Sequence, residues 1–136
     1  MASEVDTIYR TISGEEMMQI VRDMGFSPEL KTDSGGDPMI VFRVEGMKCL
    51  VLFFLVTGGR ARSLQFMGAF AIKGTLEKVN EWNRRKRYGK AHLDNAGDWA
   101  IQMDVDLDGG ARREYIEEAL KTWRSIFSAF MAFISS

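Results

Sequence analysis

The most constraining feature of this sequence is the uninterrupted apolar run Leu-Val-Leu-Phe-Phe-Leu-Val at positions 50–56. Seven residues are too few for a membrane helix, which takes roughly 20 apolar residues, so the run predicts a buried strand. Extended to 48–56, that strand is apolar on both faces, because alternate residues of a strand point to opposite sides. One face then needs helices of the same domain as cover, and the other needs more protein or a second subunit.

The segments around this strand have the patterns of an antiparallel meander followed by a hairpin. Clusters of Gly, Pro, Asp and Asn mark the turns between alternating apolar and polar runs. Proline at position 28 is compatible with a strand only at an edge, where its missing N–H faces solvent. Besides 48–56, we expect strands at 26–31, 40–45, 62–70, 91–94 and 99–107.

Three helices are expected, because apolar residues recur there at helical spacing. Ser13 and Glu16 form a capping box before a helix at 14–24, and Thr75 caps a second that ends near residue 87. The last helix covers 112–134 and has a wide apolar stripe. An order of helix, strands, helix, two strands and helix lacks the strict alternation of parallel α/β folds. We therefore predict an α+β fold with an antiparallel sheet, in one domain at 13–136 after a flexible arm at 1–12.

Composition places the protein among ordinary globular domains. The chain has 136 residues, of which 46% are hydrophobic, and 18 Lys+Arg against 19 Asp+Glu give a net charge of -1. Its one cysteine, Cys49, forms no intrachain disulfide, and burial in an apolar strand should raise its pKa. The N-terminus lacks the basic start and apolar run of a signal peptide, and Lys121 and Arg124 interrupt the apolar C-terminus. We expect a cytoplasmic protein without a membrane partner.

Catalytic and cofactor motifs are missing from the sequence. There is no Gly-x-Ser-x-Gly elbow, P-loop or dinucleotide glycine pattern, and His92 is the only histidine. His92 and Asp94 share a strand face but have no nucleophile. We predict no enzyme activity, catalytic residue, metal or cofactor. An enzyme that works through carboxylates alone is the remote alternative, with the candidates Asp94, Asp98, Asp104 and Asp106.

The segment Asp104–Gly109 matches the first half of an EF-hand loop. Position 12 of such a loop must be a bidentate Glu, but here it is Tyr115. The segment that precedes the loop has the alternation of a strand, whereas an EF-hand loop follows a helix. Carboxylates at every second strand residue stand about 6.6–7 Å apart. A charged solvent face at Asp104, Asp106 and Asp108 is therefore favoured over weak cation binding.

A basic run, Arg84-Arg85-Lys86-Arg87, has two interpretations. With Trp82 and Tyr88 beside it, the run resembles a nucleic-acid patch. Cations also complement the negative end of a helix dipole. The chain is slightly acidic and has no second basic stripe. We therefore interpret the run as a solvated helix end and do not expect nucleic acid as a partner.

The apolar surface of the double-sided strand and of the last helix exceeds what a small domain covers by itself. We therefore predict a homodimer or a bound polypeptide client. The candidate dimer or partner surface consists of Phe54, Phe127, Phe130 and Phe133.

Residues 79–110 resemble the bacterial YbjN-like family. The matching motifs are Val79-Asn80-Glu81-Trp82-Asn83, Arg87-Tyr88-Gly89-Lys90-Ala91, Leu93-Asp94, Gly97-Asp98, Asp104-Val105-Asp106-Leu107 and Gly109-Gly110. Ala111-Arg112 departs from the family pattern, which has a capping Ser or Thr there, so the last helix is expected to start without a side-chain cap.

The resemblance implies a fold similar to type III secretion chaperones, with helices packed on one face of the sheet. Members are described as sensory transduction regulators, which implies a chaperone-like or regulatory adaptor that binds protein. Asn80, Trp82, Asn83 and Tyr88 then either contact a partner or hold the family's structure together. The alternative function is a regulator that senses a small molecule held between the sheet and the C-terminal helix.

Overall fold

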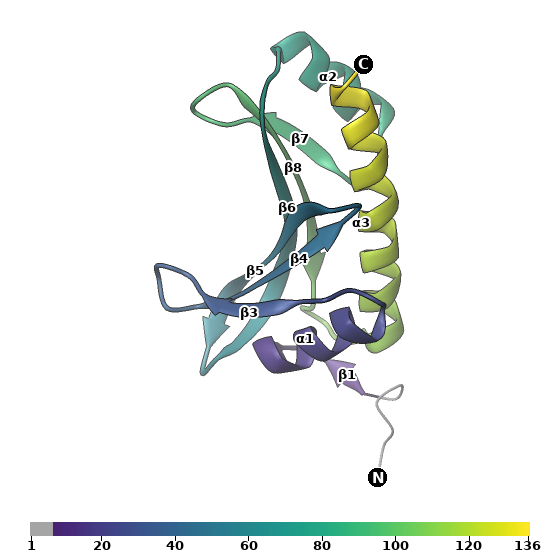
Figure 1. Cartoon of the computed structure of the whole chain (residues 1–136). Coiled ribbons are helices and arrows are strands. Elements are labelled where there is room, and N and C mark those ends of the chain that lie inside the picture. The colour runs from purple at the N-terminus through teal and green to yellow at the C-terminus, as the bar shows by residue number, and fades with distance from the viewer. Residues whose placement is uncertain (1–6) are drawn as a thin grey trace.

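A curved antiparallel sheet and one long helix beside it form the frame of the molecule (Figure 1). The structure is a computed structural model that describes residues 7–136. Its elements are β1 (Ile8–Tyr9), β2 (Ile12–Ser13), α1 (Gly14–Asp23), β3 (Glu29–Thr32), β4 (Pro38–Val44), β5 (Met47–Thr57), β6 (Arg60–Lys73), α2 (Leu76–Arg85), β7 (Lys90–Leu93), β8 (Asp98–Asp106), β9 (Ala111–Arg112) and α3 (Arg113–Ile134).

The main sheet has the strand order β3-β4-β5-β6-β8-β7, and β2 adds to β6. All of its pairs are antiparallel, so β3 to β6 form the expected meander. The β7–β8 hairpin folds back, so that β8 lies against β6 and β7 becomes an edge. One row of side chains that points toward the helices runs across four strands and consists of Ile40, Val51, Phe66 and Met103.

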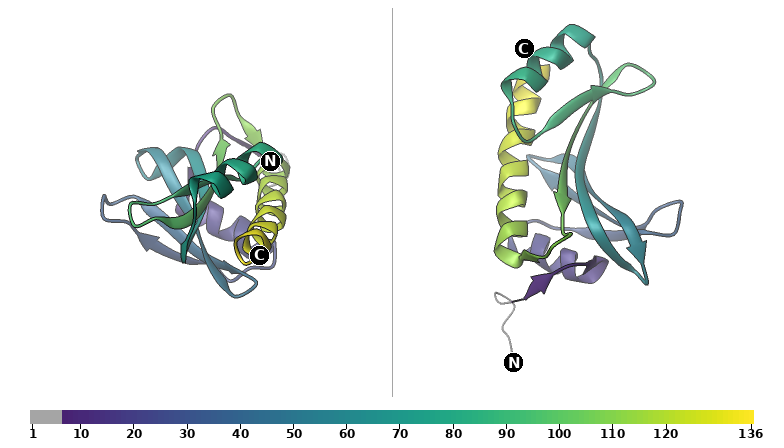
Figure 2. Two further views of the ribbon diagram at one scale, coloured as in Figure 1. Left: turned by 90° about the horizontal axis from the view of Figure 1, so that it is seen from above. Right: turned by 180° about the vertical axis from the view of Figure 1, so that it is seen from behind.

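All three helices lie on one face of the sheet (Figures 1 and 2). α3 runs along this face, with α1 near its start and α2 near its end. The core between sheet and helices is aromatic, because ring pairs join Phe66 to Trp123 at 5.9 Å and Phe70 to Phe127 at 5.4 Å between centroids. The predicted α+β class, with helices packed on one face, is confirmed.

A buried arginine joins the first and last helices. The Arg113 guanidinium donates to Asp23 Oδ2 at 2.7 Å and to Glu117 Oε2 at 3.1 Å. The hydrogen bond from Arg113 lowers the pKa of Asp23, and the same bond raises the pKa of Arg113. These interactions satisfy a charge that is costly to bury unpaired. α3 begins at this residue, after Arg112 as an N-cap without a side-chain hydrogen bond, as the missing Ser or Thr predicts.

The flexible arm predicted for residues 1–12 is wrong over 8–12. Tyr9 and Ile12 are buried, because β1 pairs with β9 and β2 pairs with β6. Residues 1–6 of the predicted arm lie outside the described residues. Several other boundaries shift by two or three residues: α2 ends at Arg85, β6 continues to Lys73, and β3 starts at Glu29, after Phe26, which packs edge-on against Phe42 at 5.4 Å. The short strand β9 was not expected from the sequence.

Candidate protein-interaction surface

The face of the sheet that points away from the helices carries an apolar patch. β4, β5 and β6 supply it, since Val41 lies opposite Leu50 and Leu50 lies opposite Met67. None of the described helices covers this face (Figure 2). Phe54 is 44% exposed, and the other side chains are partly exposed between their neighbours. We call this set the outer patch; it consists of Met39, Val41, Leu50, Leu52, Phe54 and Met67.

Two groups of opposite charge border the outer patch. Arg43 on β4 and Lys48 on β5 are cross-strand neighbours, and we call them the cationic corner. Asp104 and Asp106 on β8 are exposed on the same face and form the carboxylate corner. An apolar centre with a polar rim is typical of a protein-interaction surface.

The carboxylate corner is the EF-hand-like segment of the sequence. Asp104 Oδ1 accepts a hydrogen bond from Gln65 Nε2 at 2.9 Å, and Asp106 Oδ1 accepts one from the Asp108 N–H at 2.9 Å. The two carboxylates stand on a strand and face solvent, which is the charged face that the sequence favoured. Within residues 7–136, no group of three or more His, Cys, Asp or Glu side chains has a metal-binding arrangement.

Of the four phenylalanines predicted to form a partner surface, only Phe54 is exposed. Phe127 and Phe130 are 0% exposed, and Phe133 is partly buried with its ring 5.3 Å from Trp82. The prediction is wrong for Phe127 and Phe130, because the sheet and α2 cover this stripe of α3 completely. The double-sided strand supplies the uncovered apolar surface instead.

The family motif on α2 holds the edge of the sheet. Trp82 is buried, and its indole N–H donates to the Gly89 carbonyl at 2.9 Å. The Asn83 side chain donates to the Ala91 carbonyl at 3.0 Å and accepts from the Ala91 N–H at 2.8 Å. These two bonds satisfy backbone groups on the free side of edge strand β7. Asn83 and Trp82 therefore attach α2 to the start of β7 and to the loop before it.

The other two motif residues, Asn80 and Tyr88, are exposed. None of the side-chain hydrogen bonds found in residues 7–136 involves Asn80. Tyr88 stacks with Arg87, whose guanidinium carbon lies 5.5 Å from the ring centroid. The basic run ends α2, where Arg85 pairs with Glu81 at 3.2 Å and Lys86 Nζ lies 5.4 Å from the Trp82 ring. These contacts agree with a solvated helix end.

Replacing Asn83 by alanine is expected to destabilise the fold by about 1–3 kcal/mol, because it leaves two backbone groups of Ala91 without partners. Replacing Asn80 by alanine, three residues earlier on the same helix, should change the free energy of unfolding by less than about 0.5 kcal/mol. Urea denaturation of both variants measures the difference. Equal stability of the two variants would contradict the structural role of Asn83.

Two side chains with reactive groups, Cys49 and Asp94, are held inside the fold or in a turn. Burial raises the pKa of the Cys49 thiol to about 12, although contacts with Trp123 and Val44 oppose the rise in part. The expected raised pKa is thus confirmed, and the thiol stays protonated at neutral pH. Asp94 Oδ1 accepts from the N–H groups of Ala96 and Asp98, both at 2.9 Å, and so holds the β7–β8 turn.

Aromatic side chains fill the space between the sheet and α3 around Phe130. Phe70 lies 5.8 Å from Phe130 and Trp99 lies 5.6 Å from Phe130, measured between ring centroids. An open hollow of about 610 Å³, however, lies between the end of β4 and α3. Its lining consists of Phe26, Val44, Glu45, Arg124, Ser125, Ser128, Ala129 and Ala132.

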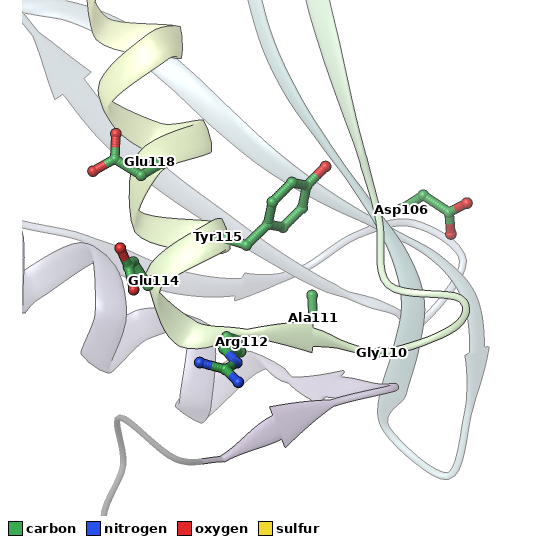
Figure 3. Close-up of a pocket in the computed structure, with 7 residues that line it drawn as sticks. All are labelled: Asp106, Gly110, Ala111, Arg112, Glu114, Tyr115 and Glu118. Atoms are coloured by element: carbon green, nitrogen blue, oxygen red, sulfur yellow. The ribbon is translucent and has the colours of Figure 1, made fainter.

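A second open cavity, of about 430 Å³, lies at the start of α3 (Figure 3). The Tyr115 side chain extends across it from α3 toward β8, whereas Asp106 points away. The cavity lining consists of Asp106, Gly110, Ala111, Arg112, Glu114, Tyr115 and Glu118.

Together these features define a small α+β protein with an uncovered apolar sheet face. Residues 13–135 match the model of the YbjN family, described as "Putative bacterial sensory transduction regulator". The chain belongs to the YbjN family, as the motifs at 79–110 indicate. No curated protein and no solved structure matches the chain. None of the helices within residues 7–136 is both long and apolar enough to cross a membrane.

Proposed function

We propose that this protein is a non-enzymatic, cytoplasmic regulatory protein that acts by binding polypeptide through its outer patch. The single observation that carries the proposal is the uncovered apolar face of β4, β5 and β6. Apolar surface gains about 25 cal/mol for each Å² removed from water, so a face of this kind gains free energy when protein covers it.

Two further observations support this function. Membership in a family described as sensory transduction regulators supports a regulatory role. The groups most suited to chemistry are committed elsewhere, since the Cys49 thiol is buried and Asp94 holds a turn. We propose that the protein acts as an adaptor. The family resemblance implies that it binds an extended segment of a client protein, as a chaperone does.

Replacing Leu52 by glutamate places a charge at the centre of the outer patch and is expected to reduce protein capture at least ten-fold. The measurement is a crosslinked pull-down of tagged protein from its native host, read by mass spectrometry. Leu76→Glu is the matched control, because Leu76 is 78% exposed on α2, away from the patch. Circular dichroism and thermal unfolding first establish that both variants are folded.

A polypeptide, whether another protein or a second copy, that is captured by wild type and Leu76→Glu but lost by Leu52→Glu supports the proposal. Capture that Leu52→Glu retains in full contradicts it. Recovery of the tagged chain alone, without crosslinked copies, also contradicts it. Phe130→Asp is unsuitable for this test, because Phe130 is a core residue and a buried carboxylate there would unfold the chain.

A further inference from the structure

We propose that this protein binds a free amino acid with an apolar side chain in the open hollow between the end of β4 and α3. The volume of this hollow is about 610 Å³, and we call it the β4–α3 hollow. It lies on the side of the sheet that faces the helices, whereas the outer patch lies on the opposite side (Figure 1). The ligand site is therefore separate from the polypeptide site and adds a second function to the proposed one.

Opposite charges stand on the two walls of the β4–α3 hollow. Glu45, in the turn between β4 and β5, lines one wall, and Arg124 on α3 lines the other. The Ser128 hydroxyl donates to Glu45 Oε1 at 3.1 Å, and Ser128 follows Arg124 by four residues on the same helix. Residues four apart on a helix are neighbours, with Cβ atoms about 5–6 Å apart. The carboxylate therefore lies about one helical turn from the point where the Arg124 side chain leaves α3.

The two charges do not neutralise each other. Within residues 7–136, Arg124 has neither a hydrogen bond nor an ion pair, and Glu45 has the bond from Ser128 but no cationic partner. A free amino acid carries an ammonium and a carboxylate on one carbon atom. Its ammonium can donate to Glu45 while its carboxylate accepts from the Arg124 guanidinium. Such charge-assisted hydrogen bonds are about twice as strong as those between neutral groups.

Ligands of a single charge fit this pair of residues less well. A simple anion is attracted by Arg124 but repelled by Glu45, and a simple cation meets the reverse. Internal residues of a polypeptide carry neither the free ammonium nor the free carboxylate. A zwitterion satisfies both walls, and the Ser125 hydroxyl lines the same hollow as a further hydrogen-bonding group.

Apolar side chains form the rest of the walls. Phe26 and Ala129 are partly exposed in the hollow, and Ala132 is exposed. Phe26 has a fixed position, because its ring packs edge-on against Phe42 at 5.4 Å between centroids. Apolar walls with a few placed polar groups are typical of small-molecule sites. They favour an amino acid whose side chain gains free energy when it leaves water.

The backbone at Glu45 is strained, which supports a use for its side chain. Glu45 has a φ of 51° and Gly46 a φ of 79°, as in the type I′ turns that favour Asn, Asp or Gly at both positions. A glutamate in this left-handed region costs stability, and such residues cluster at ligand sites. The turn is held in place because Arg43 Nη1 donates to the Gly46 carbonyl at 3.2 Å. The Glu45 carboxylate is thus positioned before any ligand arrives.

A nuclear magnetic resonance titration of the ¹⁵N-labelled full chain tests the site. The probes are the L-isomers of leucine, isoleucine, valine, methionine, phenylalanine and tryptophan. We expect saturable binding of at least one of them with a Kd below about 1 mM, with shifted amide signals concentrated at residues 44–46 and 124–132. For that amino acid, the corresponding amine without the carboxylate and the corresponding acid without the ammonium should each bind about ten-fold more weakly or worse. Glycine tests the apolar walls and should also bind more weakly.

Two variants remove one charge each and keep the size of the side chain. Glu45→Gln and Arg124→Gln are both expected to weaken binding by about ten-fold or more. The matched controls are Glu77→Gln on α2 and Lys121→Gln on α3, which change exposed charges outside the hollow and should leave binding unchanged. Circular dichroism and thermal unfolding establish that each variant is folded.

Absence of saturable binding of all six amino acids up to about 10 mM overturns the proposal. Equal binding of the amine or of the acid overturns it as well, and so does full binding by both Glu45→Gln and Arg124→Gln. These outcomes are distinct from failure of the proposed function. Leu52→Glu, which changes the outer patch on the other side of the sheet, should bind the amino acid as wild type does.

Discussion

Replacing Phe130 by alanine is expected to lower the free energy of unfolding by about 3–5 kcal/mol. The Phe130 ring is fully buried, and its centroid lies 5.0 Å from that of Trp82 and 5.6 Å from that of Trp99. Removing it leaves a cavity where α2, α3 and the sheet meet. Since the free energy of unfolding of a small domain is only about 5–15 kcal/mol, the variant should unfold at a much lower urea concentration.

The matched control for Phe130→Ala is Tyr115→Ala on the same helix. Tyr115 is 54% exposed, so its loss should cost far less. Far-UV circular dichroism in urea measures both variants. A loss of less than about 1 kcal/mol for Phe130→Ala would show that the aromatic cluster does not hold α3 to the sheet.

Replacing Gly68 by alanine is expected to destabilise the protein by about 1–3 kcal/mol, through overpacking. A Cβ atom at Gly68 on β6 would overlap Phe127 Cε1 and lie 3.2 Å from Phe127 Cδ1. Phe127 has little room to move, because it is fully buried and its ring centroid lies 5.4 Å from those of both Phe70 and Trp123. The absence of a side chain at Gly68 is therefore what lets α3 approach β6.

Gly35→Ala is the control for this substitution, because the added methyl group would meet only Asp33 Oδ1, at 3.4 Å. Thermal unfolding compares the two variants. The double variant Gly68→Ala/Phe127→Leu provides a second check, since the shorter Leu side chain lacks the overlapping ring carbon. If the clash is the cause, the double variant should lose less free energy of unfolding than the two single variants lose in sum.

Local patterns predicted the three helices and the six longer strands, but not the two-residue strands β1, β2 and β9. The capping box at Ser13 and Glu16 is present, with both of its hydrogen bonds, and α1 begins where it predicts. The alternating run before Asp106 forms β8, and the turn residues around it end the strand. Such features depend on residues that are close in sequence, so one sequence is enough to recognise them.

The candidate surface was only half predictable. The sequence indicates that β5 is apolar on both faces and that one face lacks cover, and Phe54 is exposed there. From the sequence, Phe127 and Phe130 were assigned to a partner surface. Helical spacing shows that a face of a helix is apolar, but it does not show which element covers that face. A structural role for Asn83 was likewise one of two open alternatives, and the structure alone shows its two hydrogen bonds to Ala91.

The sequence by itself determined the order of the three helices and the six longer strands, the apolar faces of these elements, and the family to which the chain belongs; it did not show the short strands β1, β2 and β9. Only the tertiary structure decided which apolar faces meet. β8 inserts between β6 and β7, α3 covers one side of the sheet, and residues 8–13 pair with strands 47 or more residues away. The physical reason is that apolar burial has no direction of its own. Any apolar face gains by contact with any other, so the fold as a whole selects the pairs and leaves the outer patch uncovered.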